Sequence, residues 1–179
     1  SPSRSTGAQA SAETMVFELW SRARGTDQEE ERFKALDVAL ERLAEIRDQA
    51  LILARKLLGL GLQQGDRVAL VAETNPDFVR FFFACQYAGL IPVAFPATIK
   101  MGAHSVYVGQ LRRLLEASAA SIAVASEGYL PFLLEASEEL DMRMVDLPEA
   151  FDQLSDQTSE LPSIEADTIS YIQYTSGST

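Results

Sequence analysis

The sequence has 179 residues, 47% of them hydrophobic, so it can bury the core of one ordinary domain. Its 26 acidic and 15 basic side chains give a formal net charge of -11, which disfavours nucleic acid and anionic membrane surfaces as partners. The single cysteine, Cys85, excludes a disulfide framework within the chain and indicates a reducing compartment, which we take to be the cytoplasm.

The first 25 residues are expected to lie outside the main domain. Residues 1–12 lack the apolar core of a signal peptide and read as a trimmed tail. Residues 13–24 contain four large apolar side chains that suit a short amphipathic helix, namely Val16, Phe17, Leu19 and Trp20. We expect Trp20 to anchor the packing of this helix.

The remaining residues, 26–179, are expected to form one α/β subdomain. The charged run at 27–32 is predicted to be the solvated start of a helix, with an acidic docking patch as the lesser alternative. Between positions 43 and 58, apolar residues recur at steps of three and four, which predicts a helix that buries one stripe.

A strand and a helix follow this first helix. Residues 67–72 form a short apolar run between turn signals, which predicts a strand buried on both faces. Asn75 and Pro76 suit the start of a helix that Gly89 ends. Residues 81–97 carry no charge, but the run is short and broken by glycine and proline, so it predicts a buried helix and then a strand rather than a membrane span.

The same alternation continues to the end of the chain. The expected elements are a strand at 91–95, helices at 106–117 and 130–140, and strands at 122–125, 143–147 and 168–174. This order predicts an α/β fold with a mostly parallel sheet flanked by helices. The acidic segment 148–166 has little periodicity and is expected to be a surface connection.

The last five residues form a turn rich in hydroxyl groups, directly after the last expected strand. They are Thr175, Ser176, Gly177, Ser178 and Thr179. Glycine lets backbone N–H groups converge on an anion, and the hydroxyl groups add donors without bulk. Open α/β sheets bind ligands beyond the carboxyl ends of their strands, so this turn is a candidate phosphate site. A Walker-type site is not indicated, because the turn has no Gly-Lys pair.

Four stretches in this order resemble the adenylate-forming, or AMP-binding, enzymes. They are GDRVAL at 65–70, NPDF at 75–78, AGLIPV at 88–93 and YTSGST at 174–179. Within that superfamily, FFFACQYAG at 81–89 together with YIQYTSGST at 171–179 is most similar to the fatty acyl-AMP ligases. The resemblance covers residues 36–179 and implies the flavodoxin-like half of the N-terminal domain of these enzymes.

The resemblance also implies an activity. Members of this family use ATP and Mg²⁺ to convert a fatty acid to acyl-AMP and pyrophosphate, and fatty acyl-AMP ligases then pass the acyl group to an acyl carrier protein of a polyketide or peptide synthase. By similarity, residues 175–179 hold the β- and γ-phosphates of ATP. The family's metal, ribose and lysine positions match nothing in this chain, so we expect no catalytic residue in it and no adenylation by it alone.

Other interpretations remain open. The full-length protein could be a long-chain acyl-CoA synthetase, or the chain could be a docking module without chemistry. Cys85 and His104 could suggest a nucleophile and base, but core packing and a solvated loop are the expected roles. Arg112 and Arg113 could face an acidic carrier protein, although a solvent face shared with Glu116 is expected. The phenylalanines at 78 and 81–83 are expected to form core rather than an acyl pocket.

Overall fold

The structure is a computed structural model that describes residues 27–97, 104–155 and 160–174. The chain divides into two compact units, residues 1–45 and 46–179, and helix α2 (Asp27–Gly59) contributes to both. The helix expected at 13–24, with Trp20, lies outside the described residues, as does the expected domain boundary at 25 and 26.

Helix α2 begins at the charged run, as predicted for residues 27–32, and earlier than the position 43 that periodicity indicated. Its early turns are exposed and are supported by charge pairs along the helix, such as Glu30 with Lys34 at 3.3 Å. Only the later turns reach the core, where four side chains are buried, namely Ala50, Leu53, Ala54 and Leu57. The apolar periodicity of the sequence therefore predicts only the part of α2 that packs against the core.

Five parallel strands form one sheet in the order β4-β3-β1-β2-β5. The strands are β1 (Arg67–Val71), β2 (Ile91–Phe95), β3 (Ile122–Val124), β4 (Met144–Asp146) and β5 (Ile172–Gln173). In the central pairs, Val68 lies opposite Pro92 on one side and Ile122 on the other. The predicted parallel α/β fold is confirmed.

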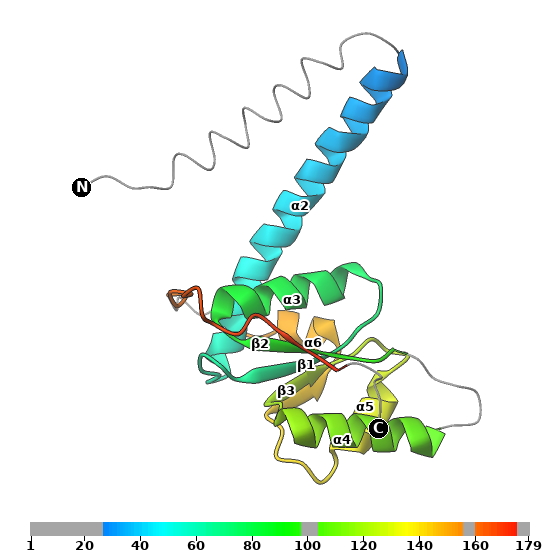
Figure 1. Ribbon diagram of the computed structural model, residues 1–179, viewed down its shortest axis with the longest axis vertical. Coiled ribbons are helices and arrows are strands. Elements are labelled where there is room, and N and C mark those ends of the chain that lie inside the picture. The colour runs from blue at the N-terminus through cyan, green and yellow to red at the C-terminus, as the bar shows by residue number, and fades with distance from the viewer. Residues whose placement is uncertain (1–26, 98–103, 156–159, 175–179) are drawn as a thin grey trace. The chain divides into compact units, whose positions relative to one another are not determined.

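Helices cover both faces of this sheet (Figure 1). On one face, α3 (Pro76–Ala88), α6 (Pro148–Asp152) and the later turns of α2 enclose a core cluster with Phe81 and Phe151. On the other, α4 (His104–Ser118) and α5 (Leu130–Ser137) enclose a second cluster with Leu111 and Leu133. The buried side chains of β1 alternate between the two clusters, with Val68 and Leu70 in the first and Ala69 and Val71 in the second.

Helix α3 begins and ends at the residues that the sequence predicted. The Asn75 side chain accepts a hydrogen bond from the backbone N–H of Phe78 at 2.8 Å, and Pro76 occupies the first turn. Gly89 has a φ of 68° and ends the helix in the left-handed conformation that favours glycine. Cys85 and its neighbour Ala84 are fully buried, as is Phe81 apart from 1% of its surface, so one side of this helix is in the core as expected. Phe83 is 44% exposed, so the core role expected for it is wrong.

Two segments differ from the sequence prediction. The segment expected to be a surface connection begins with the short helix α6, because Phe151 is fully buried against Phe81, with ring centroids 5.4 Å apart. Five residues are too few to show a helical period, which explains why the pattern missed it. The strand expected over 168–174 is reduced to the two residues of β5, which among the described strands pairs only with β2.

None of the described helices has the length and apolar character that a membrane crossing requires.

Candidate nucleotide site at the carboxyl edge of the sheet

The carboxyl ends of all five strands lie at one edge, because the strands are parallel. At this edge β1 leads to α3 on one face of the sheet, and the neighbouring β3 leads to α5 on the opposite face. Adjacent strands whose connections leave in opposite directions open a crevice between their ends. A crevice is present here, lined by Leu70 and Val71 of β1 and by Val124 of β3.

The polar groups of this crevice come from the loops that follow the two strands. Glu73, Asn75 and Asp77 follow β1, and Ser126 follows β3. Asn75 uses its side-chain oxygen to cap α3, and Asp77 accepts a hydrogen bond from Arg80 at 3.0 Å. Two of the four polar groups therefore stabilise the helix that borders the crevice.

Two tyrosines hold the chain where it leaves β2. The Tyr107 hydroxyl donates to the Pro96 carbonyl at 2.7 Å, and the Tyr129 hydroxyl donates to the Ala97 carbonyl at 2.6 Å. Burial first, and then Tyr129 and the carboxylate of Glu73, raise the pKa of Tyr107 to about 12. Tyr107 is therefore a neutral hydrogen-bond donor at physiological pH.

The sequence-predicted phosphate loop follows β5. The last described residue is Tyr174, so all five predicted site residues lie outside the described part of the chain: Thr175, Ser176, Gly177, Ser178 and Thr179. Because β5 is parallel to β2, it delivers the chain to the carboxyl edge. In the strand order, β2 lies between β5 and β1, so this end of β5 is distinct from the crevice at β1 and β3.

Helix α3 contacts the segment that leads to this loop. The Gln86 side-chain N–H donates a hydrogen bond to the Ser170 carbonyl, and the Phe82 ring lies 5.8 Å from the Tyr171 ring. Sequence reasoning assigned no such role to Gln86. The two members of each contact are more than eighty positions apart, so no local pattern could have revealed them.

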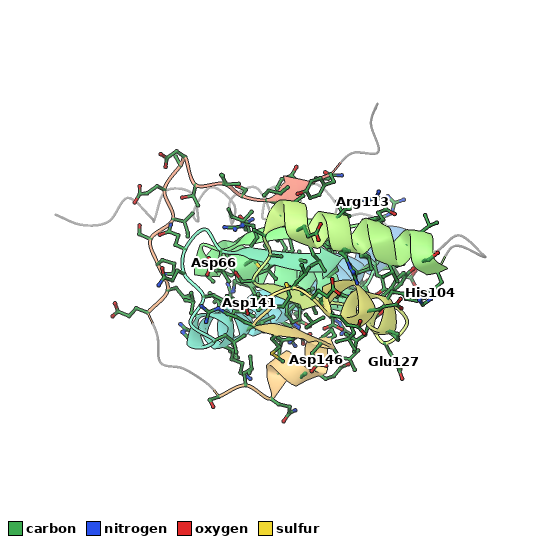
Figure 2. The ribbon with its side chains drawn as sticks, turned by 90° about the horizontal axis from the view of Figure 1, so that it is seen from below. Asp66, His104, Arg113, Glu127, Asp141 and Asp146 are labelled. Carbon is green, nitrogen blue, oxygen red and sulfur yellow. The ribbon has the colours of Figure 1, made fainter. Side chains whose placement is uncertain are left out.

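Cys85 and His104 do not form a catalytic pair. Cys85 is fully buried in α3, and burial raises the pKa of its thiol, so it is neither nucleophilic nor accessible. His104 is the first residue of α4, on the opposite face of the sheet (Figure 2). Its Nε2 lies 2.6 Å from Glu135 Oε2. The expected core role of Cys85 is confirmed. His104 is exposed as expected, but it lies in a helix and not in a loop.

Arg112 links α4 to the end of α5, and Arg113 faces solvent. The Arg112 guanidinium donates to the carbonyls of Glu135 at 2.9 Å and Ala136 at 3.2 Å, which are last-turn groups of α5. Arg113 is exposed on the side of α4 away from the sheet (Figure 2). The solvent face expected for both residues is thus correct only for Arg113.

No group of three histidine, cysteine or acidic side chains is placed to hold a metal within residues 27–97, 104–155 and 160–174.

The described fold has one parallel sheet between two layers of helices, and its strand order reverses at β1. It therefore belongs to the class of open parallel sheets that bind ligands at the carboxyl edge.

The chain belongs to the family of AMP-binding enzymes, whose model matches residues 43–179. Its fold is that of the N-terminal part of adenylate-forming enzymes. A protein of Caulobacter vibrioides named as an acyl-CoA synthetase is 39% identical over 76% of this chain and 23% of its own length. A long-chain-fatty-acid–AMP ligase of Mycobacterium marinum is 28% identical over 90% of this chain and 26% of its own length.

Among solved structures, one from work on the fatty acyl-adenylate ligases of E. coli and L. pneumophila is 34% identical, with a TM-score of 0.69, over 74% of this chain and 24% of that one. A benzoate CoA ligase of Burkholderia xenovorans shares the fold at 20% identity, with a TM-score of 0.60 over 72% of this chain and 26% of that one. The chain thus spans about a quarter of the length of these relatives.

Proposed function

We propose that this chain is the N-terminal part of an ATP-dependent ligase that converts a fatty acid to acyl-AMP and pyrophosphate, for transfer to an acyl carrier protein of a polyketide or peptide synthase. The observation that carries the proposal is the 34% identity to a solved fatty acyl-adenylate ligase over 74% of the chain. The match of the family model through residues 175–179 supports the same chemistry. The lone buried cysteine suits a cytoplasmic enzyme.

In the proposed reaction a carboxylate oxygen of the acid attacks the α-phosphorus of ATP, and the bond from this phosphorus to the bridging oxygen of pyrophosphate breaks. The acid is already ionised at neutral pH, so the step needs no general base. Residues 175–179 would donate hydroxyl and backbone N–H groups to the β- and γ-phosphates. They would thereby orient the leaving pyrophosphate and stabilise its growing charge.

ATP would arrive with Mg²⁺, which neutralises part of the phosphate charge. Serine, threonine and glycine suit a phosphate cradle, whereas Mg²⁺ prefers carboxylates. We therefore assign phosphate contacts to residues 175–179 and no metal ligand to the described part of this chain. Metal ligands, the adenine pocket and the acyl pocket would come from the remaining three quarters of the enzyme.

The test is exchange of labelled pyrophosphate into ATP by the enzyme that contains this chain, with fatty acids of increasing length and with benzoate as the comparison acid. We expect exchange that depends on a fatty acid and is weak with benzoate. Exchange with benzoate alone would assign an aromatic acid instead. Absence of pyrophosphate exchange with every acid tested would contradict the proposed activity.

A second candidate is a long-chain acyl-CoA synthetase. The 39% identity to the Caulobacter vibrioides protein favours coenzyme A as the acceptor and says nothing of the chain length. The two candidates share the first step and differ in the acceptor thiol. Incubation with ATP, fatty acid and either coenzyme A or a phosphopantetheinylated carrier protein separates them. We expect acyl-AMP to persist with coenzyme A and to be consumed by the carrier protein, whereas rapid formation of acyl-CoA would favour the synthetase.

A further inference from the structure

We propose that an exposed apolar stripe on the early turns of α2 is a docking surface for residues 13–24 of the same chain, which would pack against it as an antiparallel helix. The stripe consists of Phe33, Leu36, Leu40 and Leu43, at steps of three and four residues along the helix. Residues at such steps share one face of an α-helix. The three leucines are 41%, 43% and 59% exposed, and Phe33 is half-buried.

The opposite side of these turns is polar. Glu30 pairs with Lys34 at 3.3 Å, and Arg42 lies 4.0 Å from Glu45. At 3.6 residues per turn, both pairs fall on the side away from the stripe. A surface helix with one apolar and one polar side normally buries its apolar side. Within the part of the chain that the structure describes, the later turns of α2 bury theirs, and the stripe is left open.

The stripe is small, which favours an occupant from the same chain. From position 33 to position 43 it is about 15 Å long, and its side chains cannot supply the roughly 800 Å² that each partner buries in a standard interface between separate proteins. A tethered segment needs less area, because a short linker keeps it at an effective concentration of about a millimolar. Residues 1–26, which precede α2 and lie outside the described residues, contain such a segment.

Residues 13–24 have the sequence pattern that the stripe requires. Their spacing of i, i+3, i+4 and i+7 predicts one apolar face of a helix, formed by Val16, Leu19, Trp20 and Ala23. Glu18 falls on the other side of this helix. A helix over residues 13–24 would be about 18 Å long, so it can cover about three turns of α2, which is close to the length of the stripe.

The connection between this segment and α2 suits an antiparallel pair of helices. Gly25 and Thr26 alone separate residue 24 from Asp27, the first residue of α2. Connections of about two to five residues join antiparallel helices. Glycine commonly follows the end of a helix, and Thr26 with Glu29 three residues later matches the sequence of a capping box. The sequence therefore favours one helix that ends before Gly25 and a second that begins after Thr26.

This connection brings the two apolar faces to the same level. In antiparallel order Trp20 comes level with Phe33, and Val16 comes level with Leu36. The basic end of the segment comes level with the acidic residues 29–31 at the start of α2, so the charges are complementary as well. Length, apolar spacing and charge thus select the same occupant for the stripe.

Trp20 is the only tryptophan of the 179-residue chain, so its fluorescence reports docking directly. The test compares Leu36→Asp, which puts a charge in the stripe, with the matched control Val38→Asp. Val38 is 55% exposed and lies two positions further on, on the opposite side of α2. Acrylamide quenching in the unmodified 179-residue chain and in both variants measures the accessibility of Trp20. Amide hydrogen exchange of residues 67–71 in β1 reports the fold.

We expect weak quenching in the unmodified chain and in Val38→Asp. In Leu36→Asp, quenching should approach that of the chain unfolded in urea, because an unpaired charge under the docked segment lowers the docking equilibrium constant by about tenfold or more. Residues 67–71 should exchange at the same rate in all three proteins. Removal of residues 1–24 should speed amide exchange of residues 33–43 by about three- to tenfold, since the helix then loses its cover.

Strong quenching of Trp20 in the unmodified chain would overturn the docking role. Weak quenching in Leu36→Asp would also overturn it, because Trp20 would then pack against another surface. Unchanged exchange of residues 33–43 after removal of residues 1–24 would have the same meaning. Quenching that weakens as the chain is concentrated, with dimers in sedimentation, would assign the stripe to a second copy instead. Faster exchange of β1 in Leu36→Asp would show that the stripe belongs to the main core, which would overturn the docking role too.

Discussion

Ala119 is the one described residue other than glycine with a positive φ, at 47°. It follows the last residue of α4, where a left-handed residue commonly ends a helix and where glycine avoids the steric cost. The Arg67 guanidinium donates to the carbonyls of Ser118 at 2.8 Å and Ala119 at 3.0 Å, and these bonds hold the helix end in this geometry.

Replacing Ala119 with glycine should therefore stabilise the fold. We expect Ala119→Gly to raise the free energy of unfolding by about 0.5–1 kcal/mol, measured by urea denaturation. Ala117, also exposed and within α4, is the matched control, because glycine there should lower the stability by a similar amount. A loss of stability in Ala119→Gly would show that the left-handed backbone is not strained.

The raised pKa of Tyr107 should cause a measurable loss of folding stability at alkaline pH. Because the folded-state pKa of this acid is raised to about 12, its contribution to stability is complete below the unfolded pKa of about 10 and is lost as the pH rises from 10 to 12. Tyr107→Phe should be less stable at pH 7 by about 1 kcal/mol, because the bond to the Pro96 carbonyl is lost.

The same variant should lose less stability than the unmodified protein between pH 10 and 12. The comparison isolates Tyr107, because the buried Cys85 thiol, whose pKa is also raised, is present in both proteins. Parallel pH profiles of the two proteins in urea denaturation would contradict the assignment.

At the scale of elements, α6 shows how a five-residue helix is held. Such a helix has no stability of its own. Arg80 of α3 donates to both carboxylate oxygens of Asp152, at 2.6 and 3.1 Å, and its guanidinium also lies 5.4 Å from the centre of the Phe81 ring. Burial alone would lower the pKa of Arg80, but the carboxylates of Asp152 and then Asp77 outweigh the effect of burial. The pKa is therefore raised, and the guanidinium stays protonated.

The forked pair of Arg80 and Asp152 should therefore couple α3 to α6. The Arg80 side chain is 12% exposed and that of Asp152 is 40% exposed, so solvent screens part of the attraction. We expect a double-mutant cycle with Arg80→Met and Asp152→Asn to give a coupling free energy of about 1 kcal/mol. The Asp77→Asn variant offers a second cycle with a smaller coupling, and equal couplings would mean that the forked geometry adds nothing.

Elements with a strong local signal were predictable, and elements made by distant contacts were not. β2 was predicted with its observed bounds, because a buried parallel strand reads as a continuous apolar run, and α3 was predicted because Asn75 and Gly89 are local caps. Helix α6 depends on Phe151 reaching Phe81, and β5 depends on β2 and α3. For the candidate site, the sequence predicted the loop residues but could not reveal that Gln86 meets Ser170.

At the scale of the whole molecule, the earlier and later turns of α2 contribute very differently to burial. Within α2, the side chains from position 30 to 45 are exposed or half-buried, whereas Ala50, Leu53, Ala54 and Leu57 are buried under the sheet. Stability from burial scales with the apolar area removed from water. The free energy of unfolding of the α/β unit should therefore depend on the later turns of α2 and little on the earlier ones.

Two truncations test this expectation. Compared with a chain of residues 30–179, a chain of residues 46–179 keeps all four buried side chains of α2 and should retain the same thermal midpoint within about 3 °C, since an exposed residue changes stability by only about 0.5 kcal/mol. A chain of residues 60–179 lacks Leu53 and Leu57, each worth about 2–5 kcal/mol, and should show no cooperative transition by circular dichroism. If residues 46–179 also failed to unfold cooperatively, the early turns of α2 would be part of the stable core, and their exposure would not describe the folded protein in solution.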